Sequence, residues 1–154
     1  MNNKKAFTMI ELVFVIVVLG ILSAVAIPKF AATRTDAQIS KGRADISSIR
    51  SAIITERQSR LITGDNDYIA GDVLNTGGLF GGVLTYPISD SATSGHWTST
   101  GTDDSTKATY SYYVSTTEVK FSYSQTAQTI NGVVHKPGTF LCKKTDTYCS
   151  ELTD

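Results

Sequence analysis

The sequence predicts an α+β protein in which one long N-terminal helix packs on a small antiparallel β-sheet. Three patterns carry this prediction: an apolar run at residues 7–27, an amphipathic pattern at 28–62, and strand-like alternation within 63–154. The length of 154 residues fits one domain and excludes a large multidomain enzyme. Residues 1–62 hold 9 basic and 4 acidic side chains, and residues 63–154 hold 5 basic and 10 acidic, so the two parts differ in chemistry.

The apolar run from Phe7 to Ile27 is long enough to cross a membrane. As a helix it would measure roughly 31 Å, close to the roughly 30 Å of a bilayer's hydrocarbon core. The basic pair Lys4 and Lys5 before it favours a cytoplasmic N-terminus and an extracytoplasmic C-terminal part. A cleaved secretory signal is the alternative, because Ser23 to Ala26 imitates a cleavage site. The run is longer than such a signal needs, which favours a membrane helix.

One charge interrupts the apolar run. Glu11 lies near its N-terminal end, where an unpartnered carboxylate costs on the order of a few kcal/mol. A cation is the expected partner: Lys4, Lys5, or a new amino terminus if the chain is cut before Phe7. The alternative is that Glu11 reaches the membrane interface by itself.

The order of these residues carries a family resemblance. The N-terminal segment contains, in order, Lys4-Lys5-Ala6-Phe7-Thr8-Met9-Ile10-Glu11-Leu12, an apolar run, Gly20 and Pro28. This segment resembles the N-terminus of the type IV pilin family, which includes major and minor pilins and the pseudopilins of type II secretion and DNA-uptake systems. The resemblance covers about Lys4 to Lys29, a sixth of the chain.

The resemblance implies a processing step and a set of partners. A prepilin peptidase would cut between Ala6 and Phe7, removing residues 1–6 as a leader, and the amine of Phe7 would be N-methylated. Glu11 would pair with the N-terminal amine of a neighbouring subunit and set the register of assembly. The implied partners are further copies or other pilins, the peptidase, an inner-membrane assembly platform, and membrane lipid before assembly. The chain departs from the family pattern at Ala6, usually Gly, and at Met9, commonly Leu.

Two residues weaken the long helix. Pro28 removes a backbone donor, and Gly20 lowers helix propensity, so a kink is expected within this segment. The resemblance implies that the segment between them loses helicity in a filament. The small residues Ser23, Ala24 and Ala26 would let neighbouring helices approach closely.

The helix is expected to continue as an amphipathic segment to about Ile62. Its apolar stripe consists of Ile39, Ile46, Ile49 and Ile53, and a second stripe beside it consists of Arg43, Arg50 and Arg57. The arginine row either forms intersubunit or helix-to-head ion pairs or is a solvated helix edge of little energetic value. Both interpretations stay open from the sequence.

Residues 63–88 are rich in turn-forming residues. Asp65, Asp67 and Asp72 could ligate calcium, but their spacing matches no EF-hand loop, and we expect a solvated turn and no metal site. The clustered glycines at 77, 78, 81 and 82 lack the Lys-Ser/Thr ending of a phosphate loop, and we expect flexible backbone there.

Strand signals follow in the second half of the chain. Between residues 89 and 129, 19 of 41 residues are Ser or Thr, which favours strands and loops over helix. Thr109 to Val114 and Glu118 to Tyr123 alternate and should form a hairpin through Ser115 to Thr117. Asn131-Gly132 predicts a second tight turn. We therefore expect a sheet of three or four strands whose apolar face packs on the isoleucine stripe, a pilin-like arrangement.

Cys142 and Cys149 are the two cysteines of the chain. In an oxidising extracytoplasmic compartment they predict a disulfide that closes a short C-terminal loop. A zinc site would need more ligands, and His96 and His135 lie far away in sequence. We expect no metal and no cofactor.

No catalytic motif stands out, so we expect no enzyme: G-x-S-x-G, H-E-x-x-H and a phosphate loop are absent. A group of aromatic residues could stack on nucleic acid or sugar, namely Trp97, Tyr110, Tyr112, Tyr113 and Tyr123. The acidic balance of residues 63–154 repels phosphate, and aromatics at strand spacing are typical of a core. We therefore expect no direct nucleic-acid binding.

These observations favour a structural function. The leading hypothesis is a filament subunit that is stored in a bacterial inner membrane by one span, with its head in the periplasm, and that then polymerises into a periplasmic or extracellular filament. The rival is a membrane-tethered extracytoplasmic binding module or adhesin that does not polymerise. The shared N-terminal motif does not separate major pilins, minor pilins and pseudopilins.

Overall fold

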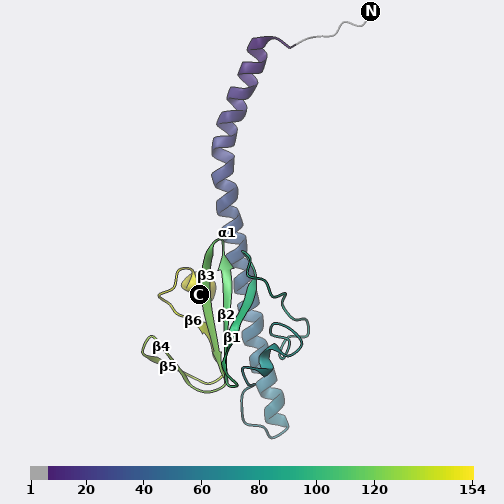
Figure 1. The fold of residues 1–154 in the computed structure, drawn as a ribbon, viewed down its shortest axis with the longest axis vertical. Coiled ribbons are helices and arrows are strands. Elements are labelled where there is room, and N and C mark those ends of the chain that lie inside the picture. The colour runs from purple at the N-terminus through teal and green to yellow at the C-terminus, as the bar shows by residue number, and fades with distance from the viewer. Residues whose placement is uncertain (1–6) are drawn as a thin grey trace, which may run out of the picture. The chain divides into compact units, whose positions relative to one another are not determined.

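The structure is a computed structural model that describes residues 7–154, apart from the side chains of residues 28, 31 and 102–104. Figure 1 shows one long helix, α1 (Met9–Ile62), followed by a small β-rich part. The remaining elements are η1 (Val73–Asn75), β1 (Trp97–Asp104), β2 (Lys107–Val114), β3 (Thr117–Ser124), β4 (Gln128–Ile130), β5 (Val133–His135), β6 (Phe140–Cys142) and α2 (Cys149–Thr153). The predicted α+β fold with a long N-terminal helix and a small antiparallel sheet is confirmed. The chain divides into two compact units between Asp36 and Ala37.

The first unit, residues 1–36, contains the N-terminal part of α1. Among its described residues the large apolar side chains are all exposed, from 36% at Val18 to 83% at Phe7. By length and composition α1 is able to cross a membrane, and it is the one such helix among the described residues. The helix continues through Gly20 and Pro28 without interruption. The predicted kink at these two residues stays a prediction.

The second unit contains a four-stranded antiparallel sheet in the order β1-β2-β3-β6. The predicted hairpin is confirmed: β2 pairs with β3 from Lys107↔Ser124 to Val114↔Thr117, so the turn consists of Ser115 and Thr116. The positive φ of Ser115, 56°, belongs to this tight turn.

The core of this unit joins the helix to one sheet face. The isoleucine stripe of α1 packs with the inward side chains of the strands, as the sequence predicts. The buried set includes Ile39, Ile46, Ile49, Ile53, Trp97, Tyr110, Tyr112, Val114, Val119, Phe121, Tyr123 and Phe140. The Tyr110 and Phe80 rings stack at 4.3 Å between centroids. Because four of the five aromatics considered as a stacking platform are core residues, they are not available for stacking on a ligand.

The second predicted turn is also confirmed. Asn131 and Gly132 have φ values of 52° and 76°, as a two-residue hairpin turn requires, and they join β4 to β5. This hairpin forms a sheet of its own. It contacts the main sheet through the Gln128 side chain, which accepts a bond from Ser122 Oγ (3.1 Å) and donates one to Thr139 O (3.1 Å).

The predicted disulfide joins Cys142, the last residue of β6, to Cys149, the first residue of α2. Both cysteines are buried in the core. The disulfide therefore fixes the C-terminal helix to an edge strand of the sheet.

Candidate functional site

The start of α1 is built by a reciprocal pair of residues. Thr8 donates to Glu11 Oε2 from both its backbone N–H and its hydroxyl, each at 2.8 Å, and Glu11 N–H donates back to Thr8 Oγ1 at 3.3 Å. The Thr8 carbonyl accepts the next helical bond, from Leu12 N. This is a capping box, which satisfies backbone donors that every helix start leaves open.

The capping box changes the interpretation of Glu11. Thr8 was not expected as a partner of Glu11, although Thr-x-x-Glu before an apolar run is the signal of a capping box. Lys4, Lys5 and Ala6 lie outside the described residues. Both Thr8 donors bind the same oxygen, Oε2, and a carboxylate has about four acceptor positions. Glu11 thus retains capacity to bind a cation while it caps the helix.

The arginine row binds main-chain carbonyls. Arg43 Nε donates to Glu151 O, Arg50 Nε donates to Phe140 O at 3.1 Å, and Arg57 Nη1 donates to Asp65 O at 3.3 Å. Burial lowers the pKa of Arg50. Among the described residues no ion pair joins these three arginines to a carboxylate. Within one chain they therefore tie α1 to the head through neutral acceptors, and the intersubunit ion pairs stay a prediction.

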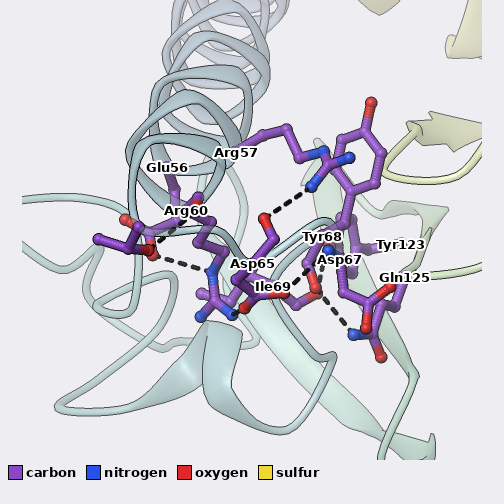
Figure 2. A network of polar contacts seen from close by, with 10 residues as sticks. Glu56, Arg57, Arg60, Asp65, Asp67, Tyr68, Ile69, Tyr123 and Gln125 are labelled. Carbon is purple, nitrogen blue, oxygen red and sulfur yellow. Dashed lines mark hydrogen bonds and ion pairs between the residues drawn. The ribbon is translucent and has the colours of Figure 1, made fainter.

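The end of α1 holds the ion pairs that the sequence analysis did not find. Figure 2 shows Arg60 between Glu56 and Asp65, with Nε to Glu56 Oε1 at 3.1 Å and Nη1 to Asp65 Oδ2 at 3.0 Å. The Arg57 guanidinium lies over the Tyr68 ring, 4.8 Å from its centroid. These contacts fix the loop that leaves the helix.

The predicted solvated turn at Asp65, Asp67 and Asp72 has its own hydrogen-bond pattern. Asp65 Oδ1 accepts the Asp67 N–H at 2.9 Å, and this bond, with the Arg60 guanidinium, lowers the pKa of Asp65. Asp72 Oδ1 accepts the Val73 N–H at 2.8 Å at the start of η1. In the described part of the chain no group of three potential metal ligands comes together. The Asp65 carboxylate thus acts in a turn and the Asp72 carboxylate as a cap, and Asp67 takes part through its backbone N–H.

The glycine cluster has a packing role that was not expected. At Gly82 an added Cβ would overlap the Val73 carbonyl, and at Gly81 it would lie 2.5 Å from the Thr76 carbonyl. The loop between η1 and β1 therefore folds closely on its own backbone, which only glycine permits.

A polar seam joins the middle of α1 to the sheet. Trp97 Nε1 donates to Asp45 Oδ2 at 3.0 Å, and Tyr112 donates its hydroxyl to Gln38 O at 2.6 Å. Lys41 Nζ reaches Gly95 O at 2.6 Å. Burial raises the pKa of Asp45, against the opposing effects of the Trp97 bond and of the nearby Lys41 and His96. These partners lie 52 or more residues apart in the chain, beyond the reach of sequence patterns.

We expect Asp45→Asn to stabilise the protein above the ordinary pKa of Asp, 3.8. The raised pKa means that the folded state binds this proton more tightly than the unfolded state does. Stability is therefore lost as the pH rises from 3.8 through the folded pKa, and Asn, which still accepts from Trp97, avoids that loss. The measurement is urea unfolding against pH, followed by fluorescence of the single tryptophan.

Asp45→Ala is the matched control, because it removes the charge and the acceptor together. Relative to Asp45→Asn, it leaves the buried Trp97 N–H without its partner, which should cost about 1–3 kcal/mol at every pH. An Asn variant that loses stability relative to wild type as the pH rises would contradict the assigned role of Asp45.

Comparison with known proteins bears on the N-terminal segment. Residues 1–27 match the family model described as the prokaryotic N-terminal methylation motif. The chain carries that motif. It contains the Ala6-Phe7 junction, the capping pair Thr8 and Glu11, and most of the exposed apolar helix.

Curated relatives extend the similarity beyond the motif. The chain is 36% identical over 72 residues to a fimbrial protein of Moraxella nonliquefaciens, covering 47% of each chain. It is 34% identical over 73 residues to the type IV major fimbrial protein FimA of Dichelobacter nodosus, covering 47% of this chain and 45% of the relative. A fimbrial protein of Pseudomonas aeruginosa is 35% identical over 52 residues, 34% of each chain. The chain thus spans about half the length, or less, of the relatives it matches. No solved structure matches significantly.

Proposed function

We propose that this chain is a structural subunit of a type IV pilus-like or type II secretion-like filament. The observation that carries the proposal is the methylation motif at residues 1–27, in which the large apolar side chains from Phe7 to Ile27 are all exposed. A row of such side chains is unstable in water and requires either lipid or other apolar helices around it. The similarity to fimbrial proteins favours packing of these side chains against other apolar helices, and it supports a structural role.

The proposed life cycle follows the divisions of the chain. Residues 1–6 are a leader that a prepilin peptidase removes at Ala6-Phe7, and residues 7–27 hold the subunit in the inner membrane until an assembly platform extracts it. Residues 28–62 carry the head, residues 63–154, which lies in the periplasm. In the filament the apolar helices pack against one another in place of lipid. The subunit is then part of a periplasmic or surface structure.

Glu11 has a proposed role in this transfer. In the membrane its carboxylate is partly satisfied by Thr8, so the stored subunit does not bury a bare charge. In the filament the free acceptor positions bind the methylated amine of Phe7 in a neighbouring copy. Each buried charge is then tolerable because the other is present, which fixes the axial register.

The experiment is to shear filaments from cells that produce the chain and to identify their subunit by mass spectrometry. We expect this chain to be a component of the filaments. Its retention in the membrane fraction as a single-pass protein, in cells that make other filaments normally, would contradict the proposal.

A further inference from the structure

A groove lies on the outer face of the four-stranded sheet, the face opposite the core. Along β2 and β3 the core-facing side chains are fully buried, and the positions that alternate with them face outward. The β4–β5 hairpin forms one wall of the groove, and in Figure 1 it stands as a separate arm on the left of the sheet. The groove has a volume of about 680 Å³, a size that suits a small organic ligand.

The lining of the groove combines cations with neutral groups that form hydrogen bonds. Three lysines surround hydroxyl and amide groups, namely Lys107, Lys120 and Lys143 with Thr109, Ser122 and Gln128. Ile130 and Leu141 add apolar surface. Phe121 and Tyr123 also contribute to the lining, but both residues are fully buried in the core. The described lining therefore offers no exposed aromatic ring.

The register of the sheet separates the lysines into two groups. Lys107 and Lys120 lie four positions apart in the β2–β3 register, roughly 13 Å along the strands. Lys143 directly follows β6, and the β3–β6 register brings it beside Lys120. The cross-strand row between the two groups is neutral and consists of Thr109, Ser122 and Leu141.

The paired lysines at one end of the groove favour an anion. Like charges on neighbouring strands oppose each other, and a negative group between Lys120 and Lys143 removes that cost. Glu118 Oε2 lies 4.0 Å from Lys120 Nζ, and the Asp146 N–H bonds to the Lys143 carbonyl in the turn after β6. Neither of these two acidic residues is part of the groove lining. A carboxylate of a ligand would form charge-assisted hydrogen bonds with both lysines.

We propose that this groove binds a segment of a polysaccharide whose sugars carry carboxylates at intervals. One carboxylate binds between Lys120 and Lys143, and a second binds Lys107 at the other end. The neutral row between them faces the sugar hydroxyls. The Thr109 hydroxyl forms no hydrogen bond within the part of the chain that the structure describes, so it is available for one. The Leu141 side chain packs against the C–H groups of a sugar ring.

A nucleic acid fits this groove less well than such a polysaccharide. One strand carries a phosphate about every 3.4 Å, so several phosphates would lie over the neutral row. Binding of single strands also uses aromatic rings on which the bases stack, and the described lining offers none. Residues 63–154 hold 5 basic and 10 acidic side chains, so the head repels a dense polyanion. This inference goes beyond the proposed function and does not depend on polymerisation.

The experiment measures binding of a fluorescent hyaluronan hexasaccharide, which has a carboxylate on every second sugar, to full-length chain in a non-ionic detergent. Lys120→Ala and Lys143→Ala should each weaken binding about tenfold, because each removes a charge-assisted hydrogen bond. Thr109→Val should weaken it about threefold through the lost hydroxyl. Lys144→Ala is the matched control: it removes the same charge from the next position, outside the groove lining, and should change the affinity less than about twofold. Thermal unfolding checks that every variant remains folded.

Two further ligands test the chemistry of the groove. A neutral chitin hexasaccharide and a single-stranded DNA hexamer should each bind at least about tenfold more weakly than the hyaluronan hexasaccharide. No saturable binding of hyaluronan to the wild-type chain would overturn the inference. Equal effects of Lys143→Ala and Lys144→Ala would also overturn it, because attraction by the general surface charge would then explain the binding. DNA that binds as tightly as hyaluronan would show a groove that does not select carbohydrate. None of these results bears on filament assembly, so the proposed function is tested separately.

Discussion

Replacing Glu11 by glutamine should reduce filament assembly by more than about a hundredfold. The amide can still accept the Thr8 hydrogen bonds that cap α1, but it cannot neutralise a methylated amine from a neighbouring copy. Removing one partner of a buried charge pair costs about 3–5 kcal/mol, because the other charge is left uncompensated. The measurement is the amount of sheared filament relative to the total subunit in the membrane.

Thr8→Val is the control that separates capping from charge. It removes the hydroxyl donor of the capping box and leaves the Glu11 carboxylate intact, so the loss should be about 1 kcal/mol of helix stability and a much smaller loss of filament. If Glu11→Gln subunits assembled like wild type while Thr8→Val subunits did not, Glu11 would be a capping residue and the charge pairing would be wrong.

Gly138→Ala should destabilise the head strongly. Gly138 has a φ of +74°, and a Cβ at this position would overlap the Tyr68 ring. The left-handed backbone costs an alanine about 1–2 kcal/mol, and the overlap adds about 1–3 kcal/mol, because Tyr68 is held by Arg57 and by the bond from Gln125 to its carbonyl. We expect a loss of about 3 kcal/mol in the free energy of unfolding.

The chain contains a matched control for this change. Gly132 has a φ of +76°, but no atom lies within 4 Å of the position of an added Cβ. Gly132→Ala should therefore show the backbone cost alone. Trp97 fluorescence during urea unfolding measures both variants. Equal losses in the free energy of unfolding would mean that overlap of the added Cβ with the Tyr68 ring does not destabilise the Gly138→Ala variant.

The sequence predicted those elements whose signal is local. The alternation in β2 and β3, the Asn131-Gly132 turn and the isoleucine spacing each depend on a few neighbouring residues, and each is found in the structure. Strand β1 was not placed because its sequence, Trp97 to Asp104, has no alternating apolar pattern and its register with β2 shifts twice. Strand β6 has three residues and pairs with β3 across a long connection.

The residues of the candidate site divide in the same way, into those with a local sequence signal and those that only the fold brings together. The cost of a carboxylate in an apolar helix is visible in the sequence, so Glu11 could be found from it. Its bonds with Thr8 also have a local signal, the Thr-x-x-Glu pattern, although only a cation was expected as its partner. The carbonyl partners of Arg43 and Arg50 lie 108 and 90 residues away in the chain, and only the fold brings them together. The arginine spacing alone could not distinguish these acceptors from carboxylates.

The proposed function depends on two events, processing of this chain at Ala6-Phe7 and its later polymerisation. Intact-mass spectrometry with N-terminal sequencing of the subunit from sheared filaments tests both parts in one sample. We expect a chain that begins at Phe7 and carries a methyl group on its amine. A chain that still begins at Met1, or one that begins near Pro28, would contradict it.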